Sequence, residues 1–438
     1  MPQDAALRVG LGSEPCVLKD VISEVEDIRK SAIHPPGEDP QVLLDDGSIK
    51  LKGFSFRSLL EITCRSRTAR DVLWLIHEAR SNDFGRLKHV LGKVDWELYL
   101  PKKATIVLNV NSTASRLFHE GAIFGHVKKA LEDQGHEVVK TSELSTHENV
   151  QHLHVTLRKN MLRIFLSLAG SPLYLRGFKT VLKATASLKE DLAAYGTRFA
   201  FSCGKAWGIK LHDVPLQIIV PFAGSGTLGF ESIMNLWNIT PILLGRSYAF
   251  EALPAFPDTF LGHTKKKLVT IMNEQQKVSP LINLTFIEND PIQAEALRDN
   301  ILSFRNRLRE ASDAQSFDEK FALFLEESDF FSWSIPTETI TGTNIFIPLN
   351  PPYGKRLGSV DDALRLYANL GQKLGMVKLS KGSSLFGFIF CPSPKFSKIF
   401  VNSLKTGSKK SHFRSTSIKH GGQIMELVAF NIMNLDSK

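Results

Sequence analysis

Apolar positions along the first 175 residues alternate with polar ones in short, mixed patterns. Spacings of three and four residues predict helices, whereas alternation and β-branched runs predict strands. We therefore expect helices over residues 17–29, 59–79 and 121–134, and strands over residues 7–11, 104–110, 153–157 and 161–168. Strands and helices mixed in this order predict one or two small α+β units.

The pattern changes near residue 180, where compact apolar runs become separated by longer helical stretches. Strands are expected over residues 216–220, 284–287 and 344–347, and helices over residues 188–200, 228–237 and 292–304. Buried strands of a parallel sheet are continuously apolar because helices cover both faces. The second half of the chain therefore predicts an α/β domain with a mostly parallel sheet.

A glycine loop joins the strand ending at residue 220 to the next helix, with the sequence Val220-Pro221-Phe222-Ala223-Gly224-Ser225-Gly226-Thr227. This order places backbone N–H groups at the carboxyl edge of the sheet, where nucleotide-like ligands bind. Gly224 and Gly226 would let a ligand approach the main chain closely. No GxxxxGK[ST] pattern follows, which argues against a P-loop NTPase. A tight turn without a ligand is the alternative.

A carboxylate at the end of the next strand would bind the ribose hydroxyls of such a ligand. Glu251 is nearer in sequence but lies among prolines, whereas Glu288 and Asp290 follow a strand-like run and precede a helix. We favour Glu288, which requires an insertion over residues 241–280. Asp329 follows a third possible strand and could accept a hydrogen bond from an adenine amine. Each acid could instead be a solvated surface residue.

The strand over residues 344–347 leads into the turn Asn350-Pro351-Pro352-Tyr353. Exocyclic amines of bases are poor nucleophiles, because the ring delocalises their lone pair. The Asn350 side-chain oxygen and the Pro351 carbonyl can accept hydrogen bonds from such an amine and hold it in line with a methyl donor. The prolines stiffen the turn, and Tyr353 can stack on an extruded base. A proline turn that merely ends a strand is the alternative.

The charge of the chain is concentrated near its C-terminus. Lys and Arg number 54 against 45 Asp and Glu, a net charge of +9. Residues 363–425 contain 11 Lys or Arg and no acid. This segment could be a solvated basic face, but beside a base site it predicts contacts with the phosphates of a nucleic acid. The residues expected to make them are Lys395, Lys409, Lys410 and Arg414.

Composition excludes several further classes of protein. A hydrophobic content of 43% excludes a chain dominated by disorder, a collagen repeat or a coiled coil. The four cysteines form no CxxC pair, so neither a disulfide framework nor a metal site is expected. No secretory signal and no membrane-length apolar run is seen, which predicts a cytoplasmic protein with no membrane partner.

Taken together, these residues resemble the THUMP-containing bacterial ribosomal RNA guanine-N2 methyltransferases over most of the chain. Residues 173–178 are similar to the Leu-x-x-Arg-Gly-Tyr exit of the family's THUMP domain, and residues 187–194 to its Lys-Glu-Thr-Leu-Ala-Ala helix. The glycine loop, the acids and the Asn-Pro-Pro-Tyr turn follow in the family's order. Residues 65–129, 153–157 and 420–422 add to the likeness.

The resemblance implies three parts. They are an N-terminal ferredoxin-like segment over residues 1–60, a THUMP RNA-binding domain over residues 61–178, and a Rossmann-like methyltransferase domain over residues 179–438. It further implies that the chain uses S-adenosylmethionine to methylate the N2 amine of a guanine in structured RNA. Ribosomal RNA, and 23S RNA in particular, is expected before transfer RNA.

The resemblance also assigns roles to individual residues. Those implied to bind the cofactor are Pro221, Phe222, Gly224, Ser225, Gly226, Thr227, Glu288, Asp290 and Asp329. Within that set, Glu288 would bind the ribose hydroxyls and Asp329 the adenine. The residues implied to present the target guanine are Asn350, Pro351, Pro352 and Tyr353.

The glycine loop departs from the family pattern at two positions. Val220 stands where the family has an acid that holds the amino-acid end of the cofactor, and Ala223 stands where it has a cysteine. One lost hydrogen bond to a charged group costs about 1.5–3 kcal/mol. Val220 therefore leaves open an RNA-binding or ribosome-assembly factor with weakened activity. N6-adenine methylation also stays open, because the Asn-Pro-Pro-Tyr turn could serve either exocyclic amine. Cytosine methylation through a cysteine is disfavoured, since neither Cys203 nor Cys391 lies in the base-site turn.

Overall fold

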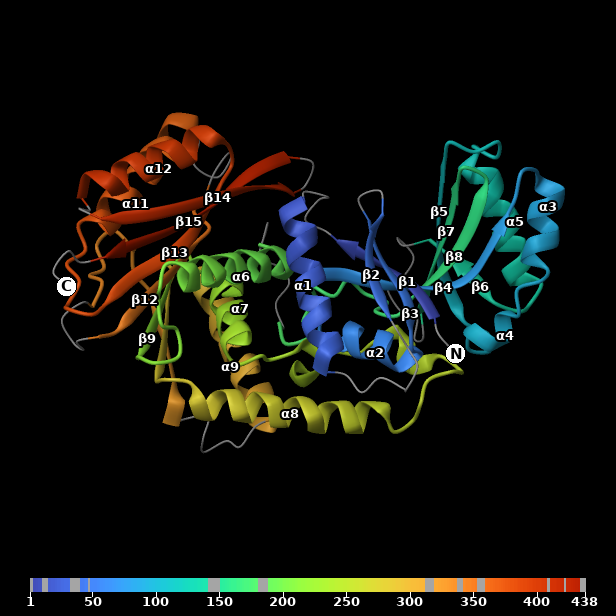
Figure 1. Ribbon diagram of the computed structural model, residues 1–438, viewed down its shortest axis with the longest axis horizontal. Coiled ribbons are helices and arrows are strands. Elements are labelled where there is room, and N and C mark those ends of the chain that lie inside the picture. The colour runs from blue at the N-terminus through green and yellow to red at the C-terminus, as the bar shows by residue number, and fades with distance from the viewer. Residues whose placement is uncertain are drawn as a thin grey trace. The chain divides into compact units, whose positions relative to one another are not determined.

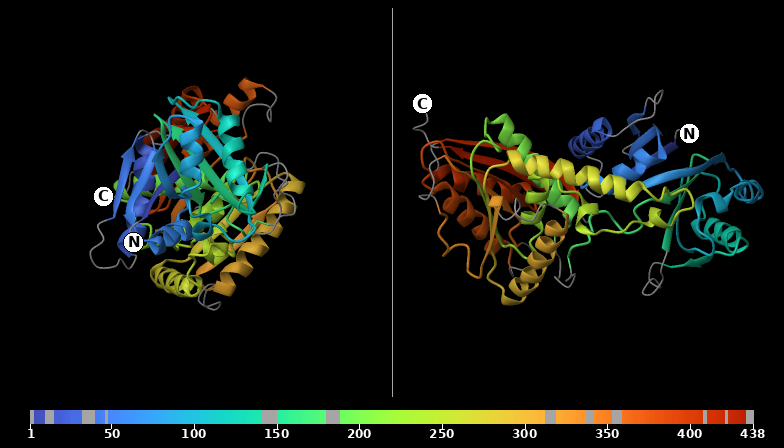
Figure 2. Two further views of the ribbon diagram at one scale, coloured as in Figure 1. Left: turned by 90° about the vertical axis from the view of Figure 1, so that its right-hand side faces the viewer. Right: turned by 90° about the horizontal axis from the view of Figure 1, so that it is seen from below.

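The computed structural model describes residues 3–9, 15–31, 40–45, 48–140, 150–179, 188–311, 319–336, 342–352, 359–407, 410–420 and 423–433. Figures 1 and 2 show the elements coloured from the N-terminus to the C-terminus. The chain divides into two compact units. Unit 1 comprises residues 1–9, 21–175 and 247–264, and unit 2 comprises residues 10–20, 176–246 and 265–438.

Unit 1 is built on a mixed eight-stranded sheet with the order β2-β3-β1-β4-β8-β7-β5-β6. β5 pairs in parallel with β6 and β7, and the other neighbours are antiparallel. Its strands are β1 (Gln3–Val9), β2 (Gln41–Asp45), β3 (Ser48–Phe54), β4 (Ala69–Arg80), β5 (Thr105–Thr113), β6 (Glu137–Val139), β7 (Val150–Arg158) and β8 (Met161–Ser167). The helical elements are α2 (Phe56–Arg65), α3 (Phe84–Leu91), α4 (Trp96–Tyr99), α5 (Glu120–Glu132), η3 (Ala249–Ala252) and most of α1 (Pro15–Ser31).

One predicted helix of this unit is wrong in its second half. The helix expected over residues 59–79 ends at Arg65, and β4 begins at Ala69. β4 lies between β1 and β8, where residues 72–76 are largely buried. An apolar run that is covered on both sides carries no helix-or-strand signal of its own. Pairing with two neighbouring strands decided the outcome.

The predicted domain boundaries can be compared with these units. The boundary expected after residue 178 lies close to the division between Leu175 and Arg176. The boundary expected after residue 60 falls inside α2, and one sheet includes strands from both sides of it. The assignment of residues 1–60 and 61–178 to a ferredoxin-like and a THUMP domain stays a prediction.

A buried carboxyl on β4 contributes to the pH dependence of the stability of unit 1. Asp71 is buried, and the Ser167 hydroxyl donates a hydrogen bond to it at 2.9 Å. Burial raises the pKa of Asp71 from 3.8 to about 7, against smaller opposing effects of Ser167 and Arg8. The folded protein therefore keeps a proton that the unfolded chain releases above about pH 4, so the stability that this proton contributes is lost as the pH rises toward 7.

We expect the Asp71 contribution to the free energy of unfolding to fall across this range by up to roughly 4 kcal/mol, whereas burial of His154, which lowers its pKa to about 4, acts in the opposite direction. An Asp71→Asn variant has no proton to release, so it should lose this part of the pH dependence and become more stable than the wild type at about pH 8. Urea unfolding of both proteins at about pH 5 and about pH 8 measures the effect. A variant with the pH dependence of the wild type would contradict the prediction.

Unit 2 is built on a seven-stranded sheet with the order β11-β10-β9-β12-β13-β15-β14. The first five strands in this order are parallel, and β15 is antiparallel to both β13 and β14. The strands are β9 (Leu216–Pro221), β10 (Ile282–Ile287), β11 (Phe321–Glu326), β12 (Asn344–Leu349), β13 (Ser384–Cys391), β14 (Ser411–His420) and β15 (Gln423–Met433). The predicted α/β domain with a mostly parallel sheet is confirmed.

Helices cover both faces of this sheet (Figure 1). The helical elements of unit 2 are α6 (Glu190–Ala206), α7 (Thr227–Leu236), η2 (Pro241–Leu244), most of α8 (Phe260–Val278), α9 (Pro291–Ala311), α11 (Val360–Gly375) and α12 (Pro394–Gly407). On one face, α11 and α12 share a buried cluster with Leu385 and Ile389 of β13. On the other, a Cβ added to Gly196 of α6 would meet the Phe388 ring at 2.7 Å. Side chains at alternate positions of β13 thus pack against helices on opposite faces of the sheet.

Candidate functional site

The order of the strands marks where unit 2 can bind a ligand. The chain runs outward from β9 through β10 to β11, and then returns to the other side of β9 with β12 and β13. β12 pairs with β9 only over Asn344 to Phe346, although it pairs with β13 as far as Leu349. The two central strands therefore separate toward their carboxyl ends. Open α/β sheets bind ligands in the crevice at such a point.

The glycine loop lies at this crevice, at the end of β9. Phe222, Gly224 and Gly226 have φ values of 53°, 52° and 82°. Positive φ is unusual for a bulky residue such as Phe222 and typical of functional loops. Gly226 directly precedes α7, and a Cβ there would meet the Phe230 ring at 2.5 Å. The loop thus needs glycine at Gly226 and aims the first N–H groups of α7 into the crevice.

The Glu288 carboxylate holds the glycine loop from the end of β10. It accepts a hydrogen bond from Gly224 N–H at 2.7 Å and another from Asp290 N–H at 3.0 Å. Asp290 in turn caps α9, because its Oδ1 accepts from Ile292 N–H at 2.9 Å. The structure thus brings Glu288 to the loop as expected and gives Asp290 a capping role that the sequence analysis did not include.

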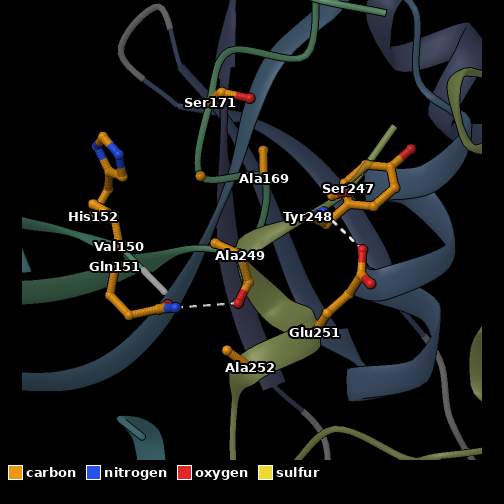
Figure 3. A pocket seen from close by; sticks show the side chains of 11 residues that line it. Val150, Gln151, His152, Ala169, Ser171, Ser247, Tyr248, Ala249, Glu251 and Ala252 are labelled. Carbon is orange, nitrogen blue, oxygen red and sulfur yellow. Dashed lines mark hydrogen bonds between the residues drawn. The ribbon is translucent and has the colours of Figure 1, made fainter. Parts of the chain in front are cut away.

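Glu251, the competing acid, belongs to unit 1. There it accepts a hydrogen bond from the backbone N–H of Tyr248 at 2.7 Å. Figure 3 shows both residues at a cavity that Gln151, His152 and Ser171 also line. The segment containing Glu251 inserts into the fold of unit 1, which supports the choice of Glu288 as the acid at the glycine loop.

Asp329 follows β11 at the same edge of the sheet and is exposed. Aromatic rings lie beside it, with Phe330 and Phe331 at 6.1 and 6.4 Å from the ring of Phe222. Lys373 of α11 fixes this segment by donating to the carbonyl oxygens of Phe331 at 3.1 Å and Trp333 at 2.7 Å. Burial lowers the pKa of Lys373, and the charge of Asp329 opposes the shift.

Asn350 directly follows β12, across the crevice from the glycine loop in the strand order. Its Oδ1 is buried, and no residue in the described part of the chain donates a hydrogen bond to it. A buried acceptor without a partner costs about 1–3 kcal/mol, so a ligand that brings a donor would bind favourably. Pro351 is buried and Pro352 half-buried. Tyr353 lies outside the described residues.

One charged residue of this site was not predicted from the sequence. The Lys179 ammonium donates to Thr227 Oγ1 at 2.6 Å and to Ser225 Oγ at 3.2 Å, and it forms an ion pair with Glu190 at 2.5 Å. Lys179 follows the Arg176-Gly177-Phe178 sequence directly, which was the one available signal. Nothing in the spacing from residue 179 to residue 225 indicates that the two lie together.

The predicted RNA-binding residues are distributed over unit 2. Lys395, in the first turn of α12, comes shortly after β13 and so lies near the crevice edge. Lys410 directly precedes β14. The start of β14 lies level with Leu385, near the start of β13, because both strands pair with β15. Lys410 therefore lies at the opposite end of the sheet from the crevice edge. Arg414 lies between Lys395 and Lys410 and hydrogen-bonds to Cys203. Lys409 lies outside the described residues. Contact with RNA at these positions stays a prediction.

Three further observations bear on the chemistry. Burial raises the thiol pKa of both Cys203 and Cys391, so neither favours a nucleophilic thiolate. Among the described residues, no group of His, Cys, Asp and Glu has the arrangement of a metal site. The described helices include none that is long and apolar enough to span a membrane.

Structural comparison finds solved proteins of similar fold. SMU.472, solved in complex with SAH, has a TM-score of 0.67 at 19% identity, with 99% of both chains covered. A predicted N6-adenine-specific DNA methylase from Listeria monocytogenes has a TM-score of 0.66 at 18% identity, over 98% of this chain and 95% of that one. These likenesses confirm the predicted fold class, an α/β chain with a Rossmann-like fold of the kind seen in solved methyltransferases.

Sequence comparison finds named relatives. The chain is 27% identical over 366 residues to ribosomal RNA large subunit methyltransferase K/L of Syntrophotalea carbinolica, covering 79% of this chain and 47% of that protein. It is 26% identical to the protein of that name from Psychromonas ingrahamii, covering 76% and 40%. The chain thus spans about half the length of the curated relatives it matches. No protein-family model matches it.

Proposed function

We propose that the chain is an S-adenosylmethionine-dependent methyltransferase that modifies the N2 amine of a guanine in structured RNA. The observation that carries the proposal is the pair of features at the crevice of unit 2. A glycine loop follows β9, and Asn350, whose buried Oδ1 has no hydrogen-bond donor among the described residues, follows β12, the neighbour of β9 in the sheet. Relatives named as ribosomal RNA methyltransferases favour RNA, and ribosomal before transfer RNA.

The residues at the glycine loop fit the cofactor. Gly224 leaves open space where a Cβ would stand, so a ligand can lie against the main chain. Glu288, which already accepts from Gly224 and Asp290, still has lone pairs for ribose hydroxyls. Asp329 would bind the adenine amine, with the rings of Phe222 and Phe331 beside it. S-Adenosylmethionine supplies a methyl group bound to a positively charged sulfur.

Asn350 and Pro351 are the residues that would orient the target base for methylation. The Asn350 Oδ1 and the Pro351 carbonyl oxygen accept hydrogen bonds from the guanine amine and hold its lone pair toward the methyl group. These oxygens would stabilise the positive charge that develops on the amine nitrogen as it is methylated. The amine proton then leaves to solvent. Tyr353 would stack on the base.

Nucleoside analysis tests the proposal. The purified chain is incubated with S-adenosylmethionine and rRNA from a strain that lacks the gene, and the digested RNA is examined by mass spectrometry. We expect N2-methylguanosine. N6-methyladenosine instead would support the adenine alternative, which the same turn could serve. Calorimetric titration that detects no heat at millimolar cofactor would contradict both enzymatic functions and favour an RNA-binding factor.

The basic residues of unit 2 allow a matched test of where RNA binds. Lys395→Glu changes a charge near the crevice edge, whereas Lys410→Glu changes one at the opposite end of the sheet. If RNA enters at the crevice, the first variant should weaken RNA binding about ten-fold at low salt and reduce its salt dependence, while the second should change it less. Filter binding across a salt series measures both. A stronger effect of the change at Lys410 would indicate that RNA binds at that end of the sheet.

A further inference from the structure

The Lys179–Glu190 ion pair lies beside the glycine loop and is unusual because it is buried. The Lys179 side chain is 8% exposed and that of Glu190 10%. Removing two charges from water is costly, and a hydrophobic pair of similar volume often serves stability as well or better. A buried pair that also contacts two hydroxyls of a ligand-binding loop is therefore better explained by what it binds.

The loop itself contains no carboxylate that could pair with a positively charged ligand group. Residues 220–227 contain no acid, and Val220 is fully buried in the sheet. Glu288 accepts from two backbone N–H groups. A carboxylate lies nearby instead. Lys179 forms an ion pair with Glu190, at the start of α6, and also donates to the hydroxyls of Ser225 and Thr227.

The same cluster offers donors to a negatively charged group. The Lys179 ammonium lies at the two hydroxyls where α7 begins, and the N-terminus of a helix adds partial positive charge. One cation with hydroxyl and backbone donors fits a carboxylate, and the adjacent Glu190 fits an ammonium. A ligand group with both charges on one carbon is an α-amino acid.

We propose that Lys179 and Glu190 bind the amino-acid end of S-adenosylmethionine, Lys179 its carboxylate and Glu190 its ammonium. This inference rests on the proposed function. In the unliganded protein the two side chains neutralise each other. With cofactor bound, each faces the opposite charge of a zwitterion, so neither state contains an uncompensated buried charge. The pair thereby supplies the carboxylate that Val220 cannot.

Three ligands that vary the amino-acid end are tested by calorimetry beside S-adenosylmethionine. Comparisons are made between ligands alike at sulfur: S-adenosylhomocysteine with 5′-methylthioadenosine, both neutral thioethers, and S-adenosylmethionine with its decarboxylated form, both sulfonium ions. S-Adenosylhomocysteine has the whole group, decarboxylated S-adenosylmethionine lacks the carboxylate, and 5′-methylthioadenosine lacks both charges. We expect Lys179→Met to bind S-adenosylhomocysteine at least ten-fold more weakly than the wild type, and 5′-methylthioadenosine within two-fold. The variant should also lose the wild type's preference for S-adenosylmethionine over its decarboxylated form, and Lys179→Arg should retain it.

Glu190→Gln separates the two halves of the site. It should weaken S-adenosylhomocysteine and the decarboxylated ligand alike, because both keep the ammonium, and leave 5′-methylthioadenosine unchanged. Lys210→Met, at a lysine that is 75% exposed, is the matched control and should bind every ligand as the wild type does. If Lys179→Met does not fold in a thermal melt, Lys179→Arg and Glu190→Gln decide the question.

The outcomes distinguish the inference from the function on which it rests. A wild-type protein that binds none of the ligands would overturn the proposed function. A wild type that binds all three, with variants that weaken 5′-methylthioadenosine as much as S-adenosylhomocysteine, would show that the pair only shapes the loop. Variants that bind all ligands normally would likewise overturn the inference and leave the methyltransferase proposal intact.

Discussion

Replacing Asn350 with Ala is expected to abolish measurable methyl transfer while leaving cofactor affinity nearly unchanged. The substitution removes the buried Oδ1 that no residue in the described chain partners. Removing one preorganised group that stabilises developing charge costs about 10²–10³-fold in kcat, and Asn350 also orients the amine. We therefore expect a loss of about 10³-fold or more, measured by transfer of a labelled methyl group to rRNA.

Two comparisons make this result specific. Asn402→Ala makes the same change at an exposed position of α12 and should keep full activity. Calorimetry with S-adenosylhomocysteine should give Asn350→Ala an affinity within about two-fold of the wild type, because the glycine loop follows a different strand. Wild-type turnover in Asn350→Ala would overturn the assignment of the base site.

The parts of the site that the sequence predicted share one property, which is that each directly follows a parallel strand. Gly224, Glu288 and Asn350 come after β9, β10 and β12, whose apolar runs stand out in the sequence. Parallel strands bring their carboxyl ends to one edge, so position along the chain was enough to place these residues together. Choosing Glu288 over Glu251 depended on the same reasoning.

The parts that were missed depend on contacts between distant segments. β4 was taken for a helix because an apolar run covered on both sides carries no periodicity, and only pairing with β1 and β8 settles it. Lys179 precedes the domain's first helix and reaches the loop through side-chain contacts. Lys410 looked close to the turn in sequence, but β14 places it at the opposite end of the sheet from Lys395.

The Arg176-Gly177 sequence is held in place by contacts on both of its residues. A Cβ on Gly177, which has a φ of 93°, would lie 3.0 Å from the backbone of Arg246. Arg176 Nε donates to Glu231 Oε1 of α7 at 2.8 Å, with both side chains essentially unexposed. The motif thus fixes the chain just before Lys179 to the helix that follows the glycine loop.

Arg176→Leu should therefore destabilise the protein strongly. Removing one partner of a buried ion pair leaves the other charge uncompensated and costs about 3–5 kcal/mol. Urea unfolding followed by circular dichroism should show this loss in the transition of unit 2. Arg365→Leu breaks an exposed ion pair with Asp362 and should cost less than about 1 kcal/mol, since solvent screens that pair.

The double variant Arg176→Leu/Glu231→Leu decides whether the charge itself is responsible. If the cost of the single change comes from the Glu231 carboxylate left buried without Arg176, replacing both residues should recover a large part of the lost stability. If it comes from lost packing, the double variant should be at least as unstable as the single one. Because α7 begins at Thr227, a protein destabilised here should also bind S-adenosylhomocysteine more weakly, and the double variant should regain binding together with stability.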